Sequence, residues 1–469
     1  MTLNALHLEV PDILEGEATA LADLNEQLAR ARLQARELAL QEALGLLFRL
    51  NRSAMTLLER QRALQSCSDE YRHYAAACCT GTPPSPLFVR LCSELANGFK
   101  RLLLQMFQGR QPSRPHLAWC LYMAQHFHAQ GLLRHYQLYQ EPPPALWRDS
   151  HLLYWLAEQH DCLDEPVAAA FQPPPASTPR GLYQQMLLLA LSNPFHLTEG
   201  ECPQLFGALA PLAELARLQP LDEDDESDAP IVDLTEAQPC LGYARLADGG
   251  REHLRRLEVG ALLIALDEPA PLQSSGDRQL LERVKPHWMG RQQRRHPRTE
   301  HEAQCRLVIG LAAIHADLAG QRPPQLSAQM LDVSPGGARL LCTADNSGRL
   351  DVGQLVLLMA SSGSPTLALV RWRHINGEGL HLGLRYLKGL ARPVWLRRAP
   401  SAQTHLGVLQ STPSPGNGWQ HGLWLANGQF GEGENLWLQL ASALNQTVLP
   451  LPAANLGTTV VTRHPLHLG

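Results

Sequence analysis

Two short stretches of the chain decide how its second half folds. They are Arg-Gln-Gln-Arg-Arg-His-Pro-Arg at residues 291–298 and Asp-Val-Ser-Pro-Gly-Gly at residues 332–337. The second stretch lies between two apolar runs whose residue types are typical of β-strands. This part of the chain is therefore expected to be rich in β-structure, with the polar residues of both stretches placed around it.

The side chains of these two stretches have complementary binding chemistry. Arg294 and Arg298 carry planar, permanently charged guanidinium groups, which can hold a phosphate through two hydrogen bonds and lie flat against a purine ring. Asp332 supplies a carboxylate, which accepts hydrogen bonds from the N–H groups of a guanine edge, and Ser334 supplies a hydroxyl. Gly337 has no side chain, so a ligand can approach the backbone closely there. The pattern predicts a site for an anion and a guanine base.

The two halves of this pattern differ greatly in specificity. The chain has 40 Lys and Arg residues, of which 3 are lysine and 37 are arginine. At that frequency roughly three Arg-x-x-x-Arg matches are expected by chance, and Arg291 with Arg295 forms another one. A chance Asp/Asn-x-Ser-x-x-Gly match is expected on the order of 0.2 times per chain. The second motif, one strand downstream, therefore carries the argument; without it, residues 283–298 are better interpreted as a solvated basic linker.

In this order and context, residues 290–390 resemble the PilZ domain, a small β-barrel that binds the bacterial second messenger cyclic di-GMP. The resemblance covers roughly a fifth of the chain and extends past the two motifs. Residues 369–372, followed by residues 379–386, are similar to the closing hairpin of that family. The resemblance implies a PilZ-like antiparallel β-barrel at residues 290–392.

The resemblance also implies which residues contact cyclic di-GMP. Arg294 and Arg298 match the arginine pair on the flexible segment that leads into the barrel. The motif on the barrel surface is matched by Asp332, Ser334 and Gly337, and Arg295 is a further candidate ligand residue. The chain departs from the family pattern in two places. Gln293 stands where a basic residue is frequent, which bears on how many nucleotides bind. Residues 310–325 are predicted to form an inserted helix and a proline turn, which bears on how the arginine segment folds onto the barrel.

Composition limits the class of protein. The chain has 469 residues, 45% of them hydrophobic and 18% charged, so two to four globular domains are expected. Its net charge of −5 argues against a dedicated nucleic-acid binder. The first residues lack the basic start and apolar core of a signal peptide, and no run reaches the ~18 apolar residues of a membrane span. A cytoplasmic protein without membrane insertion is therefore expected.

Cysteine and histidine do not predict a metal site. The 10 cysteines include no C-x-x-C pair, so buried, small apolar side chains are favoured over metal ligands or disulfides. His126 and His128 lie near His135, which suggests a metal cluster as the alternative. Such spacing on one amphipathic helix is more often surface or interface chemistry, and no H-E-x-x-H motif occurs. No metal is predicted.

The first half of the chain has the period of α-helices. Apolar residues recur every three or four positions between residues 15 and 218, which predicts six or more helices in a helical domain at residues 1–220. The clearest seam consists of Leu21, Leu24, Leu28, Ala31, Ala35 and Leu38. One long helix packed inside the domain is favoured for it, and a dimerising coiled coil is the alternative.

The remaining segments complete a multidomain α+β architecture. The acidic run at residues 221–229 predicts a linker. A connector is expected at residues 230–289, with strands at 231–234 and 260–265 and a helix near 277–289. Alternating apolar residues predict a small C-terminal β domain at residues 403–469, in which Asn427 and Gly428 form a type I′ hairpin turn.

These observations favour a binding protein over an enzyme. The sequence has no G-x-S-x-G elbow, no Walker loop and no paired-carboxylate motif. The leading hypothesis is a cyclic di-GMP receptor that couples the nucleotide to an unidentified protein partner through the helical domain, with no further cofactor. The first alternative is a nucleotide-independent structural adaptor with a degenerate barrel. The second is a hydrolase site hidden among the histidines of the helical domain.

Overall fold

The computed structural model describes most of the chain, in residues 8–14, 21–78, 85–109, 112–168, 171, 175–221, 229–240, 252–268, 274–290, 296–342, 350–360, 364–414, 418–440 and 446–466. It divides into two compact units. The first consists of Met1–Pro194 and Glu199–Gln293, and the second of Phe195–Thr198 and Arg294–Gly469.

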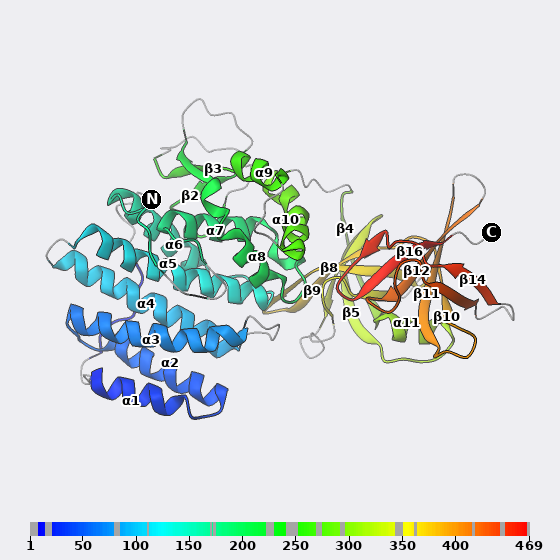
Figure 1. Ribbon diagram of the computed structural model, residues 1–469, viewed down its shortest axis with the longest axis horizontal. Helices are drawn as coiled ribbons and strands as arrows, with labels where there is room; N and C mark the ends of the chain where they lie inside the picture. The colour runs from blue at the N-terminus through cyan, green and yellow to red at the C-terminus, as the bar shows by residue number, and fades with distance from the viewer. Residues whose placement is uncertain are drawn as a thin grey trace. The chain divides into compact units, whose positions relative to one another are not determined.

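The first unit is mainly helical, as predicted (Figure 1). Its first helices are α1 (Leu21–Ala31), α2 (Arg36–Arg52), α3 (Leu57–Cys78), α4 (Pro86–Gln108), α5 (Arg114–Gln137), α6 (Pro144–Gln159), α7 (Pro179–Leu191) and α8 (Glu201–Leu209). Proline occupies one of the first two positions of α4, α5, α6 and α7. Proline is favoured there because its fixed φ suits the helix and the missing N–H would have no partner in the helix anyway. Helix α5 forms the centre, since nearly every residue from Leu117 to Arg134 is buried.

The apolar seam at residues 21–38 does not form one long helix. Helix α1 ends at Ala31 and α2 begins at Arg36, so the chain turns where the sequence predicted continuity. Leu24 and Leu28 are buried, whereas Leu38 is 54% exposed. The seam is thus divided between two helices that pack on each other and on neighbouring helices of the same unit.

A small sheet and two helices complete the first unit. The elements are β1 (Arg217–Pro220), β2 (Ile231–Asp233), β3 (Leu254–Glu258), α9 (Gly260–Asp267) and α10 (Ser275–Trp288). Strands β1 and β2 both pair antiparallel with β3. In the sequence, β1 and β2 stand on either side of the acidic run, of which residues 222–228 lie outside the described residues. The strand expected at residues 260–265 is wrong, because that run is helical in α9. Its Ala and Leu residues favour a helix, and an apolar run this short has no period that distinguishes the two.

The second unit contains a closed antiparallel barrel, which confirms the fold class. Its strands, in order around the barrel, are β4 (Thr299–Ile309), β5 (Leu326–Ser334), β6 (Gly337–Cys342), β9 (Gly379–Tyr386), β8 (Thr366–Asn376) and β7 (Leu355–Ala360). Strand β7 pairs with β4 and closes the barrel. Alternate residues point inward, and Leu307, Leu340 and Leu382 are fully buried in its core. The predicted closing hairpin corresponds to the paired strands β8 and β9.

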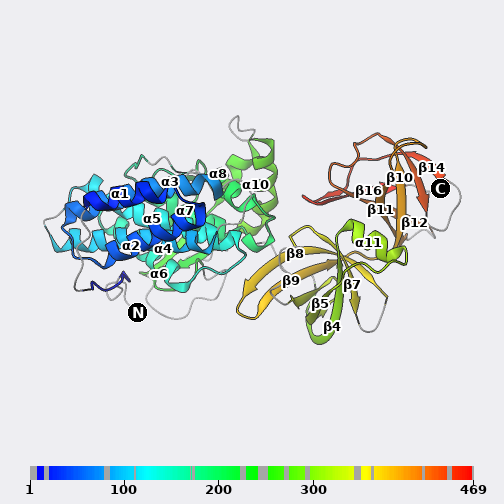
Figure 2. The same cartoon turned by 90° about the horizontal axis from the view of Figure 1, so that it is seen from below.

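The predicted insertion forms a helix that joins the barrel to a second sheet. Helix α11 (Leu311–Leu318) lies between the barrel and the C-terminal strands (Figure 2). Its Ile314 is fully buried in one core with Leu355 of the barrel and with Val408 and Trp424 of the second sheet. Barrel and sheet therefore share apolar packing, and the inserted helix is part of it.

The C-terminal sheet has the strand order β14-β13-β10-β11-β12-β16-β15. The strands are β10 (Leu390–Arg397), β11 (His405–Pro413), β12 (Trp419–Ala426), β13 (Asn435–Leu440), β14 (Gln446–Pro450), β15 (Leu456–Gly457) and β16 (Val461–Leu466). The hairpin expected at Asn427-Gly428 is wrong. The chain does turn, with Gly428 at φ 72°, but Asn427 is not among the residues with the positive φ that a type I′ turn needs. Strand β12 pairs with β11 and β16, and β13 pairs with β10 and β14.

Among the described residues, no helix combines the length and the apolar character needed to cross a membrane.

Candidate functional site

The Asp-x-Ser-x-x-Gly motif forms the turn between two neighbouring barrel strands. Strand β5 ends at Ser334 and β6 begins at Gly337, and these two residues pair across the ladder. The Ser334 hydroxyl donates to the Gly337 carbonyl oxygen at 3.3 Å, which holds the turn. Asp332 lies just before the turn, opposite Arg339 on β6 and opposite Glu300 on β4. The motif therefore places its carboxylate and its hydroxyl at one end of the barrel.

Arg298 reaches the motif from the other half of the pattern. Its Nη1 lies 3.0 Å from Asp332 Oδ1 and donates to Oδ2 at 3.2 Å. The Arg298 side chain is 30% exposed and the Asp332 side chain 15%. Arg298 stands immediately before β4, whose first residue, Thr299, pairs with Val333 of β5, and this register carries the arginine to the aspartate. The fold thus unites the two sequence motifs in one ion pair.

The other two predicted arginines, Arg294 and Arg295, lie outside the described residues, as does Gln293. The described part of the arginine segment begins at His296, which is exposed and lies beside the turn of the motif. A Cβ built on Gly336 would be 3.6 Å from His296 Cδ2, an ordinary contact distance. The segment therefore runs past the β5–β6 turn before Arg298 reaches Asp332.

A second arginine at this site was not predicted. Arg339 Nε lies 3.9 Å from Asp332 Oδ2, and the side chain is 43% exposed. Within the part of the chain that the structure describes, its Nε is covered from solvent without a hydrogen-bond partner. The signal was present in the sequence, because Arg339 follows Gly337 by two residues and residues two apart share one face of a strand. Asp332 is therefore flanked by two guanidinium groups.

Gly337 has a packing role in the barrel. A Cβ at this position would lie 2.0 Å from the backbone oxygen of Leu384 on β9. Contacts that short do not occur between real atoms, so β6 and β9 can pair here only if residue 337 is glycine. The close approach that the sequence suggested for a ligand is made, in this structure, by a neighbouring strand.

The end of β9 completes the surroundings of the motif. Arg385 pairs with Gly337, and the Tyr386 amide donates to the Gly336 carbonyl oxygen at 2.9 Å. Burial lowers the pKa of Arg385. Burial raises the pKa of Tyr386, and the nearby Cys305 and Asp332 add to the rise. Both groups thus keep their ordinary charge states near neutral pH, Arg385 cationic and Tyr386 neutral.

This arrangement suits a ligand that is an anion and that also carries hydrogen-bond donors of its own. Arg298 and Arg339 present N–H groups for phosphate oxygens, and Asp332 presents acceptors for N–H groups. Among the described residues, no group of three or more His, Cys, Asp or Glu side chains could hold a metal ion. The eight cysteines with described side chains are free, and all but Cys240 are buried.

A known protein family matches part of the first unit. Residues 20–224 match the family described as the N-terminal domain of the cyclic-di-GMP receptor FimW. The closed six-stranded barrel that follows is consistent with a PilZ-like domain. A search of curated proteins found no match. The description of this family thus names a cyclic di-GMP receptor.

Proposed function

We propose that the barrel end around Asp332 binds cyclic di-GMP and that the helical unit passes the binding event to a protein partner. One observation carries the proposal for the site: Arg298 and Asp332, from the two separate motifs, meet in an ion pair. Arg294, Arg295 and Ser334 complete the proposed ligand set, with Arg339 as an addition from the structure. The match at residues 20–224 supports the receptor function from the other half of the chain.

Binding would exchange the ion pair for contacts with the ligand. A phosphate would take two hydrogen bonds from the Arg298 guanidinium, and a guanine edge would donate to Asp332. A partly exposed ion pair contributes only about 0–1 kcal/mol. Hydrogen bonds to charged groups contribute roughly 1.5–3 kcal/mol each, so the exchange favours the nucleotide. Arg339 would remain near Asp332 and would continue to compensate the negative charge of Asp332.

The arginine segment supplies the coupling. It joins the end of α10 in the first compact unit to the start of β4 in the second. A ligand that draws Arg294, Arg295 and Arg298 onto the barrel constrains this connection. Allosteric coupling between two such sites typically amounts to about 1–3 kcal/mol, which is a 5- to 150-fold change in affinity for the partner.

The nucleotide-independent adaptor remains the second candidate, and two observations favour it. The charge of Asp332 is already compensated by Arg298, so it needs no ligand to balance it. Gly337 is explained by strand packing alone. Neither observation, however, accounts for the arginines at 294 and 295 in the sequence that precedes the barrel.

Calorimetry separates the two candidates. We expect the full-length protein to bind cyclic di-GMP and to show much weaker binding of linear guanine nucleotides, because only the cyclic ligand presents both phosphates and both bases together. Asp332→Asn should weaken binding, since an amide replaces one acceptor with a donor. Absence of heat with cyclic di-GMP at several hundred micromolar would leave the adaptor.

A further inference from the structure

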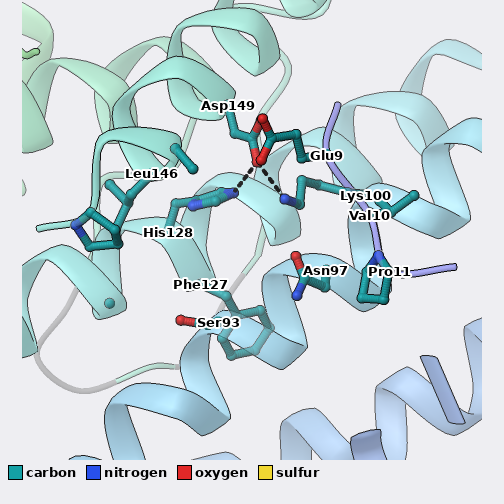
Figure 3. A pocket seen from close by; sticks show the side chains of 13 residues that line it. Glu9, Val10, Pro11, Ser93, Asn97, Lys100, Phe127, His128, Leu146 and Asp149 are labelled. Carbon is teal, nitrogen blue, oxygen red and sulfur yellow. Dashed lines mark hydrogen bonds and ion pairs between the residues drawn. The ribbon is translucent and has the colours of Figure 1, made fainter. Parts of the chain in front are cut away.

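A pocket in the first unit contains a buried group of charged and polar side chains that the proposed nucleotide site does not use. Its volume is about 370 Å³, and it lies between α4, α5 and α6. Lys100 of α4 donates to Asp149 of α6, and their side chains are 4% and 3% exposed. His128 of α5 points at the same carboxylate, with Nε2 4.0 Å from Asp149 Oδ2 (Figure 3).

His128 places a buried ring nitrogen beside this pocket. Its side chain is 8% exposed, and its Nε2 is buried without a hydrogen-bond partner among the described residues. Burial, together with the charge of Lys100, holds the pKa of His128 well below its ordinary value, so the imidazole is neutral at physiological pH. His126 and His128 are both buried, which corrects the surface position that their spacing on a helix predicts. A buried polar atom without a partner has a free-energy cost, and a hydrogen-bonding ligand would remove it.

A segment of the same chain already lies against this pocket. Residues 8–14 form neither helix nor strand, and Glu9, Val10 and Pro11 line the pocket (Figure 3). Pro11 fixes its own φ and keeps the preceding Val10 out of the helical region, which favours an extended course. Leu8 is buried and anchors one end, and the Leu14 amide donates to the Arg52 carbonyl oxygen at 2.8 Å. We name residues 8–14 the strap.

Adjacent residues of α6 recognise one acidic residue of the strap at two points. The Asp149 carboxylate accepts a hydrogen bond from the Glu9 backbone amide. Arg148 Nη2 lies 3.0 Å from Glu9 Oε1, with the two side chains 40% and 61% exposed. Arg148 and Asp149 thus contact both the backbone and the side chain of an acidic residue. The Lys100–Asp149 pair fixes the carboxylate for this purpose.

The charges of strap and pocket rim are complementary. The strap carries Glu9 and Asp12, and the positive charges of Arg148 and Arg101 lie near them. Burial lowers the pKa of Arg101, and the charge of Asp12 opposes this effect, which places Asp12 near Arg101. An exposed ion pair such as Glu9–Arg148 contributes little to stability, so the strap is held weakly at that point. A competing segment could therefore displace it.

We propose that the surface of α4–α6 on which the strap lies, at the edge of this pocket, is a docking site for an acidic, extended peptide segment of a partner protein, and that the strap occupies this site in cis. The inference rests on the proposed function in one respect, that the helical unit carries the partner surface. The partner segment places an acidic residue on Arg148 and Asp149, followed by an apolar residue and proline, as Glu9, Val10 and Pro11 do. An attached segment acts at an effective concentration on the order of millimolar, so the strap regulates access to the site.

The test uses the full-length protein without nucleotide and a fluorescein-labelled peptide of residues 7–15. Fluorescence anisotropy should show weak binding to the wild-type protein, because the strap competes. Glu9→Arg replaces the attraction of the strap for Arg148 by repulsion between two arginines and should strengthen peptide binding by roughly three- to ten-fold, since the competing closed state is depopulated. Glu9→Gln, which is milder for folding, should give a smaller change in the same direction. Glu236→Arg, an exposed acidic residue outside the pocket, is the matched control and should behave as wild type.

Charge reversal tests whether Arg148 contacts residue 9 of the bound peptide. Arg148→Glu protein should lose the labelled peptide and should bind a peptide with Glu9→Arg instead. The proposal is overturned if the peptide fails to bind folded Glu9→Arg and Glu9→Gln proteins at several hundred micromolar. It is also overturned if Arg148→Glu leaves peptide preference unchanged. A parallel titration of cyclic di-GMP into the same samples shows whether the nucleotide proposal fails independently, because the barrel residues are untouched.

Discussion

Replacement of Arg298 by lysine tests whether the nucleotide site needs a guanidinium group or only a positive charge. In the structure, Arg298 faces both oxygens of Asp332 through Nη1 alone, at 3.0 and 3.2 Å. This geometry leaves its other N–H groups for a phosphate. A lysine ammonium is a compact, strongly hydrated point charge, so it can pair with Asp332 but cannot at the same time hold two phosphate oxygens or stack on guanine.

The expected magnitude follows from the hydrogen bonds lost. Arg298→Ala removes a charged hydrogen-bonding partner, which costs about 2 kcal/mol, or roughly 30-fold in affinity. Arg298→Lys should weaken cyclic di-GMP binding nearly as much. The folded state should be little affected, since a partly exposed ion pair contributes only about 0–1 kcal/mol.

Calorimetric titration of both variants and wild type, with thermal melts as the folding control, measures this difference. Arg322→Lys makes the same substitution at an exposed arginine in the turn after α11 and should bind as wild type does. If Arg298→Lys also binds like wild type, the arginine segment is only an electrostatic patch and the proposed geometry is refuted.

Three further predictions concern stability. Gly337→Ala should destabilise the barrel by about 1–3 kcal/mol or more in a urea melt, because its Cβ would lie 2.0 Å from the Leu384 oxygen; an unchanged midpoint would show that the strands shift freely. A fragment of residues 1–290 should unfold more cooperatively than residues 1–220 in circular dichroism, because β2 and β3 complete a sheet with β1; equal stability would place the boundary at the acidic run. Burial, aided by nearby arginines, lowers the pKa of His126 to about 3, so the unfolded state binds more protons than the folded state between pH 6.5 and about 3, and stability should fall as the pH drops through that window. His126→Leu should flatten this pH dependence in melts at pH 7 and 4.5, and an unchanged dependence would exclude His126 as its source.

Local patterns in the sequence were sufficient for the type of most elements. Helical periodicity identified the first unit, and alternation identified the strands of the second. They were insufficient where local preferences are balanced. The apolar run at residues 260–265 suits a strand or a helix, and packing selected helix α9. The seam at residues 21–38 contains no residue that forbids a helix, yet the chain turns after Ala31 so that α1 and α2 pack on each other.

The candidate site divides in the same way. The sequence by itself determined the chemical groups of the site: the arginine pair, Asp332 and Ser334 lie in short motifs whose residue types define what they can bind. Only the tertiary structure decided which groups meet. The β4–β5 register brings Arg298 to Asp332, 34 residues further along the chain. Contact between the strap and Asp149 likewise joins residues far apart in the chain. Such contacts depend on strand register and helix packing over long sequence separations, and a local pattern of residues carries no information about either.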